Sequence, residues 1–253
     1  MTADWDPDQY RRFEAERDQP FHVLLSLLAP VPGGAVVDLG CGVGRLTAFA
    51  HHALGASSSL GIDSSAAMLA RSPAAPGLAF EPGDIAAWTA PPSVDAVLSN
   101  AALHWVPDHG DVLARWVAAL RPGGQLAVQV PANADHPAHR LVGEVAAELG
   151  LDVGPDPVAA NVLSPEAYAA ILDGLGAAEQ HVRLQVFVHH LASSTEVVEW
   201  LKGTTLTRVR TATDDAAYDR FLAAYRARLV AEIGNRAPYP YFFKRVVFWA
   251  RYT

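Results

Sequence analysis

Residues 36–47, VVDLGCGVGRLT, place three glycines at alternate positions after an acidic residue, Asp38. Small apolar side chains precede Asp38, so Gly40, Gly42 and Gly44 follow the end of a predicted strand. Glycine at such a turn lets the backbone reverse tightly and lets a ligand approach without meeting a Cβ atom. A simple turn needs fewer glycines, so the spacing favours a ligand-binding loop. The spacing G-x-G-x-G also differs from the dinucleotide pattern G-x-G-x-x-G, which argues against a pyrophosphate ligand.

Two further acids lie where the next two predicted strands end, Asp63 in LGIDSS and Asp84 in EPGDIAAW. A carboxylate at the first place can accept hydrogen bonds from both hydroxyls of a ribose. At the second place it can accept from an adenine amino group, with Ile85 against the ring. Each acid has an alternative role, Asp63 as a helix N-cap and Asp84 as a turn residue. Together, beside a glycine loop, the two acids favour a nucleoside ligand.

The rest of the chain alternates strand-like apolar runs with segments of helical composition. Strands are predicted at residues 35–39, 59–62, 78–80, 94–99, 125–130, 177–191 and 245–252. Helical segments between the first five strands indicate parallel pairing, with helices on both faces of the sheet. About residues 192–242, mostly helical in pattern, separate the last two strands. We therefore expect an α/β fold with a mostly parallel seven-stranded sheet and a helical cap inserted before the last strand.

The composition is that of a globular protein of 253 residues, of which 51% are hydrophobic. A net charge of −8 without a basic cluster argues against nucleic-acid and membrane partners. Cys41 is the only cysteine, so no intrachain disulfide can form. The acidic N-terminal segment does not resemble a signal peptide, and no apolar run approaches the ~20 residues of a membrane span. We expect a cytoplasmic protein.

The motifs and their order resemble the Rossmann-like S-adenosylmethionine-dependent methyltransferases over about residues 30–131. VVDLGCGVGRLT, GIDSSAAML, GDIAAW, VLSNAALHWVPDH and LRPGGQLAVQVP carry this resemblance. Beyond them, DWDPDQYRRFEAERDQP, EWLKGTTLTR and YPYFFKRVVFWARYT are similar to the trans-aconitate methyltransferases of that family. The resemblance implies a Rossmann-like fold, S-adenosylmethionine as cofactor and methylation of a carboxylate of a small polycarboxylic acid. Trans-aconitate is the leading candidate for this acid. It also implies a lid at 1–30, a core at 31–191 and 243–253, and a cap at 192–242.

The resemblance further implies which residues contact each ligand. The residues implied for the cofactor are Tyr10, Arg17, Asp38, Gly40, Cys41, Gly42, Gly44, Asp63, Ser64, Met68, Asp84, Ile85 and Asn100, with Phe13 joining Tyr10 and Arg17 in the lid. Those implied for the acceptor are His104, Trp105, Lys202, Arg208, Tyr239, Tyr241 and Arg245. Thr207 departs from the pattern, because some members carry an arginine there.

Neighbouring residues on a strand point to opposite sides, so Lys244 and Arg245 cannot both face the acceptor. The planar guanidinium of arginine binds a carboxylate through two hydrogen bonds, which favours Arg245.

A carboxylate acceptor is already ionised at neutral pH and needs no general base. The protein then has to align the reactants and exclude water, so no acid/base pair is expected, and His104 is only a weak candidate for a base. His136 and His139 could share a helix face, but no carboxylate at ligand spacing completes a metal site. Residues 99–102, SNAA, lack the segment typical of methyltransferases acting on nucleobase amines. The alternatives are another small-metabolite acceptor, an NAD-dependent oxidoreductase and a noncatalytic S-adenosylmethionine-binding module.

Overall fold

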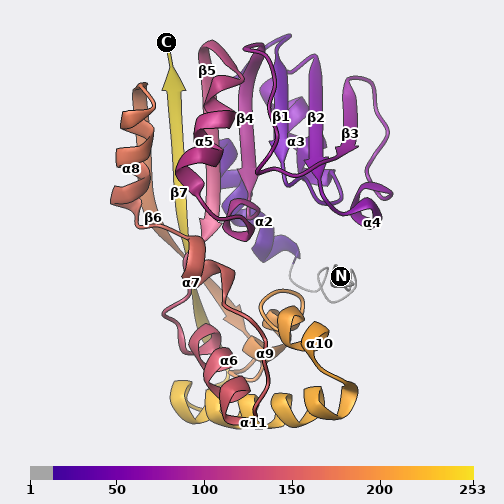
Figure 1. The fold of residues 1–253 in the computed structure, drawn as a ribbon, viewed down its shortest axis with the longest axis vertical. Helices are drawn as coiled ribbons and strands as arrows, with labels where there is room; N and C mark the ends of the chain where they lie inside the picture. The colour runs from indigo at the N-terminus through magenta and orange to yellow at the C-terminus, as the bar shows by residue number, and fades with distance from the viewer. Residues whose placement is uncertain (1–13) are drawn as a thin grey trace. The chain divides into compact units, whose positions relative to one another are not determined.

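The computed structural model describes residues 14–253, with side chains from Asp18 onward. In the described residues, seven strands form one sheet in the order β3-β2-β1-β4-β5-β7-β6 (Figure 1). Strand β1 pairs in parallel with β2 and β4, β2 with β3, and β4 with β5, whereas β7 is antiparallel to β5. The strands are β1 (Ala35–Leu39), β2 (Ser58–Asp63), β3 (Leu78–Pro82), β4 (Val94–Asn100), β5 (Leu120–Pro131), β6 (Ala177–Leu191) and β7 (Tyr239–Tyr252). The predicted mostly parallel seven-stranded α/β fold is confirmed.

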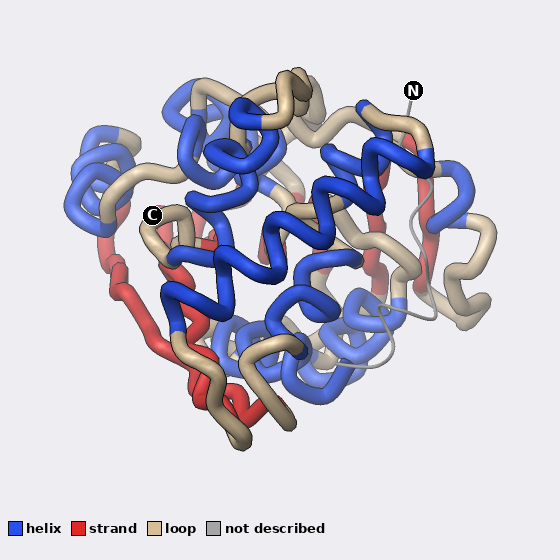
Figure 2. Tube along the Cα trace, turned by 90° about the horizontal axis from the view of Figure 1, so that it is seen from below, coloured by secondary structure: helices blue, strands red, loops and turns tan. Residues whose placement is uncertain are grey.

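Helices connect most of these strands, and Figure 2 distinguishes the two kinds of element by colour. The described helices are α2 (Glu14–Leu25), α3 (Arg45–Leu54), α4 (Ala66–Leu69), the 3-10 turn η1 (Leu103–Trp105), α5 (His109–Ala118), α6 (Pro137–Glu148), α7 (Pro157–Asn161), α8 (Pro165–Gly174), α9 (Glu196–Lys202), α10 (Thr207–Ala212) and α11 (Asp215–Ile233). None of the helices in this part of the chain is long and apolar enough to cross a membrane.

The described chain divides into two compact units. The sheet unit contains residues 19–131, 161–185 and 245–253. The helical unit contains residues 14–18, 132–160 and 186–244. Residues 132–160, which the sequence analysis placed with the sheet, thus group with the helices of the expected cap.

The sheet unit buries both faces of its strands. On one face, Phe21 of α2 and Leu54 of α3 join a cluster that includes Val247 and Trp249 of β7. On the other face, Phe248 stacks on Tyr168 of α8, with ring centroids 4.6 Å apart. Because successive side chains of a strand point to opposite faces, this alternation along β7 requires helices on both sides of the sheet.

The helical unit has its own apolar core. Helix α11 lies alongside α6, and both contribute to a cluster that also contains residues of α9 and β7 (Figures 1 and 2). The hydroxyl of Tyr225 on α11 donates to the backbone carbonyl of Ala138 on α6 at 2.5 Å. The side chain of Asp214 begins α11 by accepting a hydrogen bond from the backbone of Ala217.

The last strand begins at Tyr239, so the prediction of a start at 245 is wrong. Pro238 and Pro240 argue against a strand here, because proline lacks the backbone donor that a sheet uses. The side chains of Tyr239, Tyr241 and Phe243, at alternate positions, are nevertheless all buried in the core of the helical unit. Burial of three aromatic rings outweighs the lost hydrogen bonds.

Candidate active site

The glycine loop joins β1 to α3 in the sheet unit. Gly40, Gly42 and Gly44 have φ angles of 87°, 57° and 71°, a left-handed conformation that side chains rarely adopt. A Cβ atom on Gly40 would lie 2.1 Å from the Cβ of Ala102, so the loop packs directly on the segment that follows β4. A Cβ on Gly42 would meet nothing within 4 Å. The loop is therefore close-packed at Gly40 and open at Gly42, where a ligand can approach.

The carboxylate of Asp63, at the end of β2, holds this loop. One oxygen accepts a hydrogen bond from the backbone of Gly42 at 2.8 Å, and the other accepts from the backbone of Ser65 at 2.9 Å. Ser65, not Asp63, is the N-cap of α4, where it accepts from the backbone of Met68 at 3.3 Å. Each carboxylate oxygen can accept a second hydrogen bond, so Asp63 retains acceptor capacity for ribose hydroxyls.

Asp38 and Cys41 lie beside Asp63 in the sheet unit. The hydroxyl of Thr47 donates to one oxygen of Asp38 at 2.5 Å, and the other oxygen is buried without a hydrogen-bond partner among the described residues. Burial raises the pKa of the Asp38 carboxyl to about 7, and the charge of Asp63 adds to this effect. Burial likewise raises the pKa of the Cys41 thiol far above its usual value, so the thiol stays protonated.

The end of β3 leads into Asp84 and Ile85. The carboxylate of Asp84 is exposed and accepts a hydrogen bond from the backbone of Ala86 at 2.9 Å, as its alternative role in a turn would require. Ile85 is buried, and its carbonyl accepts from the indole of Trp116 on α5 at 2.9 Å. Trp116 thus fixes the backbone that carries both residues implied for an adenine ring.

Asn100 ends β4 beside Gln129 of β5. The side-chain amide of Gln129 donates to the side-chain oxygen of Asn100 at 2.6 Å, which fixes the orientation of the Asn100 amide. The next residue, Ala101, has a positive φ of 54°, a strained conformation that often marks functional loops. Gln129 was missed by the sequence analysis, although a glutamine inside the apolar run QLAVQV is a visible signal.

His104 and Trp105 form η1, and His109 holds this turn in place. His104 is 6% exposed, whereas Trp105 is 54% exposed. One ring nitrogen of His109 lies 3.0 Å from each of two carbonyls of this segment, so it carries the proton and donates. The other ring nitrogen then accepts from the hydroxyl of Tyr168 at 2.7 Å. The sequence alone did not identify His109, because its partner on α8 is distant along the chain.

The residues implied for the acceptor are divided between the two units. Lys202, Arg208, Tyr239 and Tyr241 belong to the helical unit, and Arg245 belongs to the sheet unit. Of the residues implied for the lid, Arg17 lies in α2, whereas Tyr10 and Phe13 lie outside the described residues.

The lysines of this set are engaged in ion pairs. The ammonium of Lys202 contacts Glu199 at 2.9 Å, and that of Lys244 contacts Asp135. Arg245 follows Lys244 on β7 and is 8% exposed. The alternation of the strand thus separates the two cations, and the buried one is the arginine.

Comparison with known proteins identifies the family. A family model described as a methyltransferase domain matches residues 36–124, which contain the glycine loop, Asp63 and Asp84. A trans-aconitate 2-methyltransferase of Deinococcus radiodurans is 44% identical over 254 residues, covering 97% of each chain. The chain belongs to the trans-aconitate 2-methyltransferase family. A second member, from Klebsiella pneumoniae, is 38% identical, covering 91% of this chain and 89% of its own.

Solved structures agree with the fold of this trans-aconitate 2-methyltransferase family member. A putative methyltransferase of Haloferax volcanii, in complex with the Trm112 activator, has a TM-score of 0.60 at 17% identity, covering 97% of this chain and 94% of its own. Phosphoethanolamine N-methyltransferase 2 of Haemonchus contortus, in complex with S-adenosyl-L-methionine, has a TM-score of 0.58 at 17% identity, covering 93% of this chain and 52% of its own. These structures support the fold, whereas the family match shows that the protein is a methyltransferase and excludes the oxidoreductase alternative.

Replacing Asp63 tests its assignment. We expect Asp63→Ala to weaken binding of S-adenosylmethionine by about 1.5 to 3 kcal/mol, the range for hydrogen bonds to a charged group. Asp111→Ala, an exposed acid on α5, is the matched control and should bind as the wild type does. Isothermal titration calorimetry gives both affinities. Unchanged affinity in a folded Asp63→Ala variant would exclude the ribose-side role.

The buried carboxyl of Asp38 predicts a pH-dependent stability. Its pKa of about 7 in the folded protein exceeds the usual 3.8, so the folded state binds the proton more tightly than the unfolded state does. Stability from this group is therefore present at low pH and lost as pH rises toward and through about 7. Between pH 5 and pH 8, we expect the free energy of unfolding of Asp38→Asn to rise by at least ~1.4 kcal/mol relative to that of the wild type. This figure is the equivalent of one pKa unit.

Urea unfolding of the cofactor-free proteins at both pH values measures this difference. Asp95→Asn serves as a comparison, because Asp95 is also buried but accepts from the backbone of Ala35 and pairs with Arg121. A constant difference between Asp38→Asn and the wild type would show that the Asp38 carboxyl does not change ionisation in this range.

Proposed function

We propose that the protein transfers a methyl group from S-adenosylmethionine to a carboxylate of a small polycarboxylic acid, with trans-aconitate as the acceptor and a monomethyl ester as the product. The observation that supports this most strongly is the 44% identity to a trans-aconitate 2-methyltransferase across 97% of both chains. A different small-metabolite acceptor is the alternative within the same reaction class. We also propose that the enzyme works in the cytoplasm, as its single cysteine suggests.

The residues of the sheet unit fit this cofactor. The unpartnered buried oxygen of Asp38 suits a cationic amino group, and the open side of Gly42 admits a ligand at the loop. Asp63 would bind the ribose, and Asp84 and Ile85 would contact the adenine. Asn100 would lie near the sulfur. When bound, S-adenosylmethionine supplies a methyl group on a positively charged sulfur.

The protein's own task is then positioning. An ionised carboxylate is already nucleophilic, so the chain has to align it with the methyl carbon and exclude water. A net charge of −8 repels a polycarboxylate at long range, so a few converging cations must capture it. Arginine suits this task, because its planar guanidinium forms paired hydrogen bonds with a carboxylate.

A methyl-transfer assay tests the proposed function. The purified protein is given methyl-labelled S-adenosylmethionine and, in separate reactions, trans-aconitate, cis-aconitate, citrate, isocitrate and succinate. We expect labelled monomethyl ester from trans-aconitate, identified by mass spectrometry, at the highest kcat/KM of the set. Labelling of none of these acids would refute carboxylate methylation. Cofactor binding without any transfer would instead favour the noncatalytic binding module.

Arg245→Met tests the buried arginine of β7. If Arg245 binds an acceptor carboxylate, the KM should rise by roughly tenfold to a hundredfold, corresponding to the loss of one charge-assisted hydrogen bond. Cofactor affinity should change little, and the preference for tricarboxylates over monocarboxylates should weaken. Arg245→Lys keeps the charge and should recover part of the affinity. If both variants retain the wild-type KM and preference, the acceptor is held by other residues.

A further inference from the structure

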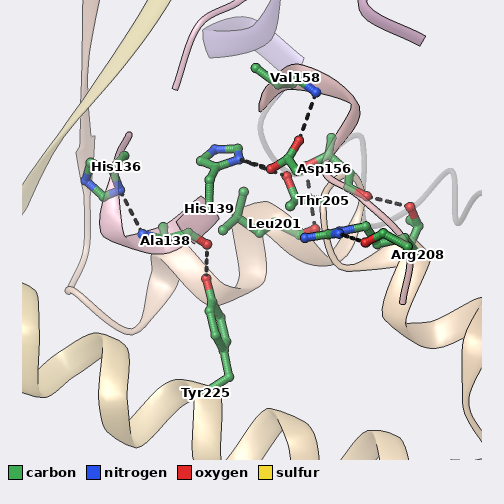
Figure 3. A network of polar contacts seen from close by, with 12 residues as sticks. His136, Ala138, His139, Asp156, Val158, Leu201, Thr205, Arg208 and Tyr225 are labelled. Atoms are coloured by element: carbon green, nitrogen blue, oxygen red, sulfur yellow. Dashed lines mark hydrogen bonds and ion pairs between the residues drawn. The ribbon is translucent and has the colours of Figure 1, made fainter. Parts of the chain in front are cut away.

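A pocket in the helical unit brings Arg208, which the resemblance implies for the acceptor, beside a histidine and a carboxylate that have no role above. Its volume is about 290 Å³, and its lining includes His139 of α6, Asp156 before α7 and Arg208 of α10. Figure 3 shows these three side chains converging from separate segments. The sequence analysis found no carboxylate near His139, because Asp156 comes beside it only when the loop before α7 folds back.

Every oxygen of Asp156 has a partner. One accepts from the backbone of Val158 at 2.9 Å, and the other lies 3.8 Å from the nearer ring nitrogen of His139, Nδ1. The same nitrogen lies 3.3 Å from the hydroxyl of Thr205. Burial raises the pKa of Asp156, but its interactions with His139, the backbone of Val158 and the charge of Arg208 together hold the pKa below its usual value. The carboxylate therefore stays ionised.

The opposite ring nitrogen of His139, Nε2, has no such partner. The side chain is 4% exposed, and Nε2 is buried without a hydrogen bond to any described residue. The Nε atom of Arg208 is also buried without a hydrogen bond to any described residue. Its Nη1 donates to the carbonyl of Gly154 at 2.6 Å. Leaving buried polar groups of this kind unpaired is energetically costly. Two of them in the lining of one pocket indicate a missing ligand.

The chemistry of the two nitrogen atoms defines that ligand. Arginine can only donate, so Nε of Arg208 requires an acceptor atom. The negative charge of Asp156 acts on Arg208, but it leaves Nε of Arg208 without a hydrogen-bond partner among the described residues. A carboxylate supplies two acceptor oxygens and one negative charge, and it matches a guanidinium edge. The volume is sufficient for a small organic acid.

We propose that this pocket binds a carboxylate that accepts hydrogen bonds from Nε–H of Arg208 and from Nε2–H of His139. Asp156 and the hydroxyl of Thr205 lie beside the other ring nitrogen of His139, Nδ1. A polycarboxylate acceptor and a separate carboxylic acid both present this group. The proposal rests on the proposed function only where the ligand is taken to be the acceptor.

Nuclear magnetic resonance can observe the arginine contact directly. The Nε–H signal of Arg208 is assigned by its absence in Arg208→Lys, and ¹⁵N-labelled protein with S-adenosylhomocysteine is titrated with trans-aconitate or with tricarballylate. We expect this signal to shift with either acid, while the Nε–H signal of Arg210 stays in place. Arg210 is the matched control, because it lies on the same helix, is half-exposed and pairs with Asp215.

Calorimetry with the same two acids measures the energetic effect. We expect Arg208→Met to weaken binding by about tenfold or more, as for one lost charge-assisted hydrogen bond. His139→Leu should weaken binding less, and His139→Gln should recover part of the loss through its amide. Arg210→Met should bind like the wild type. Circular dichroism of every variant confirms that it is folded.

The outcomes separate the two sources of the carboxylate. If Arg208→Met also raises the KM for trans-aconitate, the pocket holds the acceptor. If it weakens tricarballylate binding but leaves that KM unchanged, the pocket holds a separate acid. Unchanged affinities in both Arg208→Met and His139→Leu, with no shift of the Arg208 signal, would overturn the proposal. The titrations require no turnover, so a failure of the methylation assay would refute the proposed function without deciding this one.

Discussion

The hydrogen bonds that the Asp63 carboxylate accepts from the backbone of Gly42 and Ser65 are the constraint on which the conformation of the glycine loop depends. Asp63 ends β2, and the glycine loop leaves the neighbouring strand β1, so the carboxylate ties together two chain reversals at one edge of the sheet. The loop has a positive φ at each of its three glycines and would otherwise have many alternative conformations. The half-buried carboxylate of Asp63 selects one of these conformations. The same group keeps acceptor capacity for a ligand, which explains why an acid and not an amide suits this position.

The electrostatic consequence appears at Asp38. Placing a second carboxyl near Asp63, in a fully buried position, makes its ionisation costly. The hydroxyl of Thr47 compensates one oxygen, and the other oxygen remains without a partner in the described residues. A cationic group of a ligand would relieve both the charge repulsion and the missing hydrogen bond. In the proposed complex with S-adenosylmethionine, such a group would recover the stability that ionised Asp38 costs.

The sequence predicted the sheet and the cofactor loop well because their signals are local. Strand periodicity, alternate glycines and acids at strand ends are each visible within about ten residues, and residues 177–191 form a strand as predicted. The start of β7 was predicted wrongly for the opposite reason, since burial of Tyr239 and Tyr241 against helices distant in sequence outweighs the effect of Pro238 and Pro240. Gln129 and His109 were missed because their partners come from other elements. Such contacts depend on tertiary packing, which no local pattern records.

For the acceptor, the sequence could predict that cationic residues are needed but not which contacts each of them makes. Charge alone required cations, and the structure shows how differently the available ones are used. Lys202 and Lys244 each contact an acid of the chain, which neutralises them. Arg208 instead donates to a carbonyl, which satisfies one nitrogen and leaves the charge in place. Because burial lowers the pKa of Arg208 and Asp156 only partly offsets that effect, the guanidinium is held in an environment that favours an added anion. The proposed capture of an acid by this acidic protein would thus depend less on the number of cations than on how far each is neutralised by an acid of the chain.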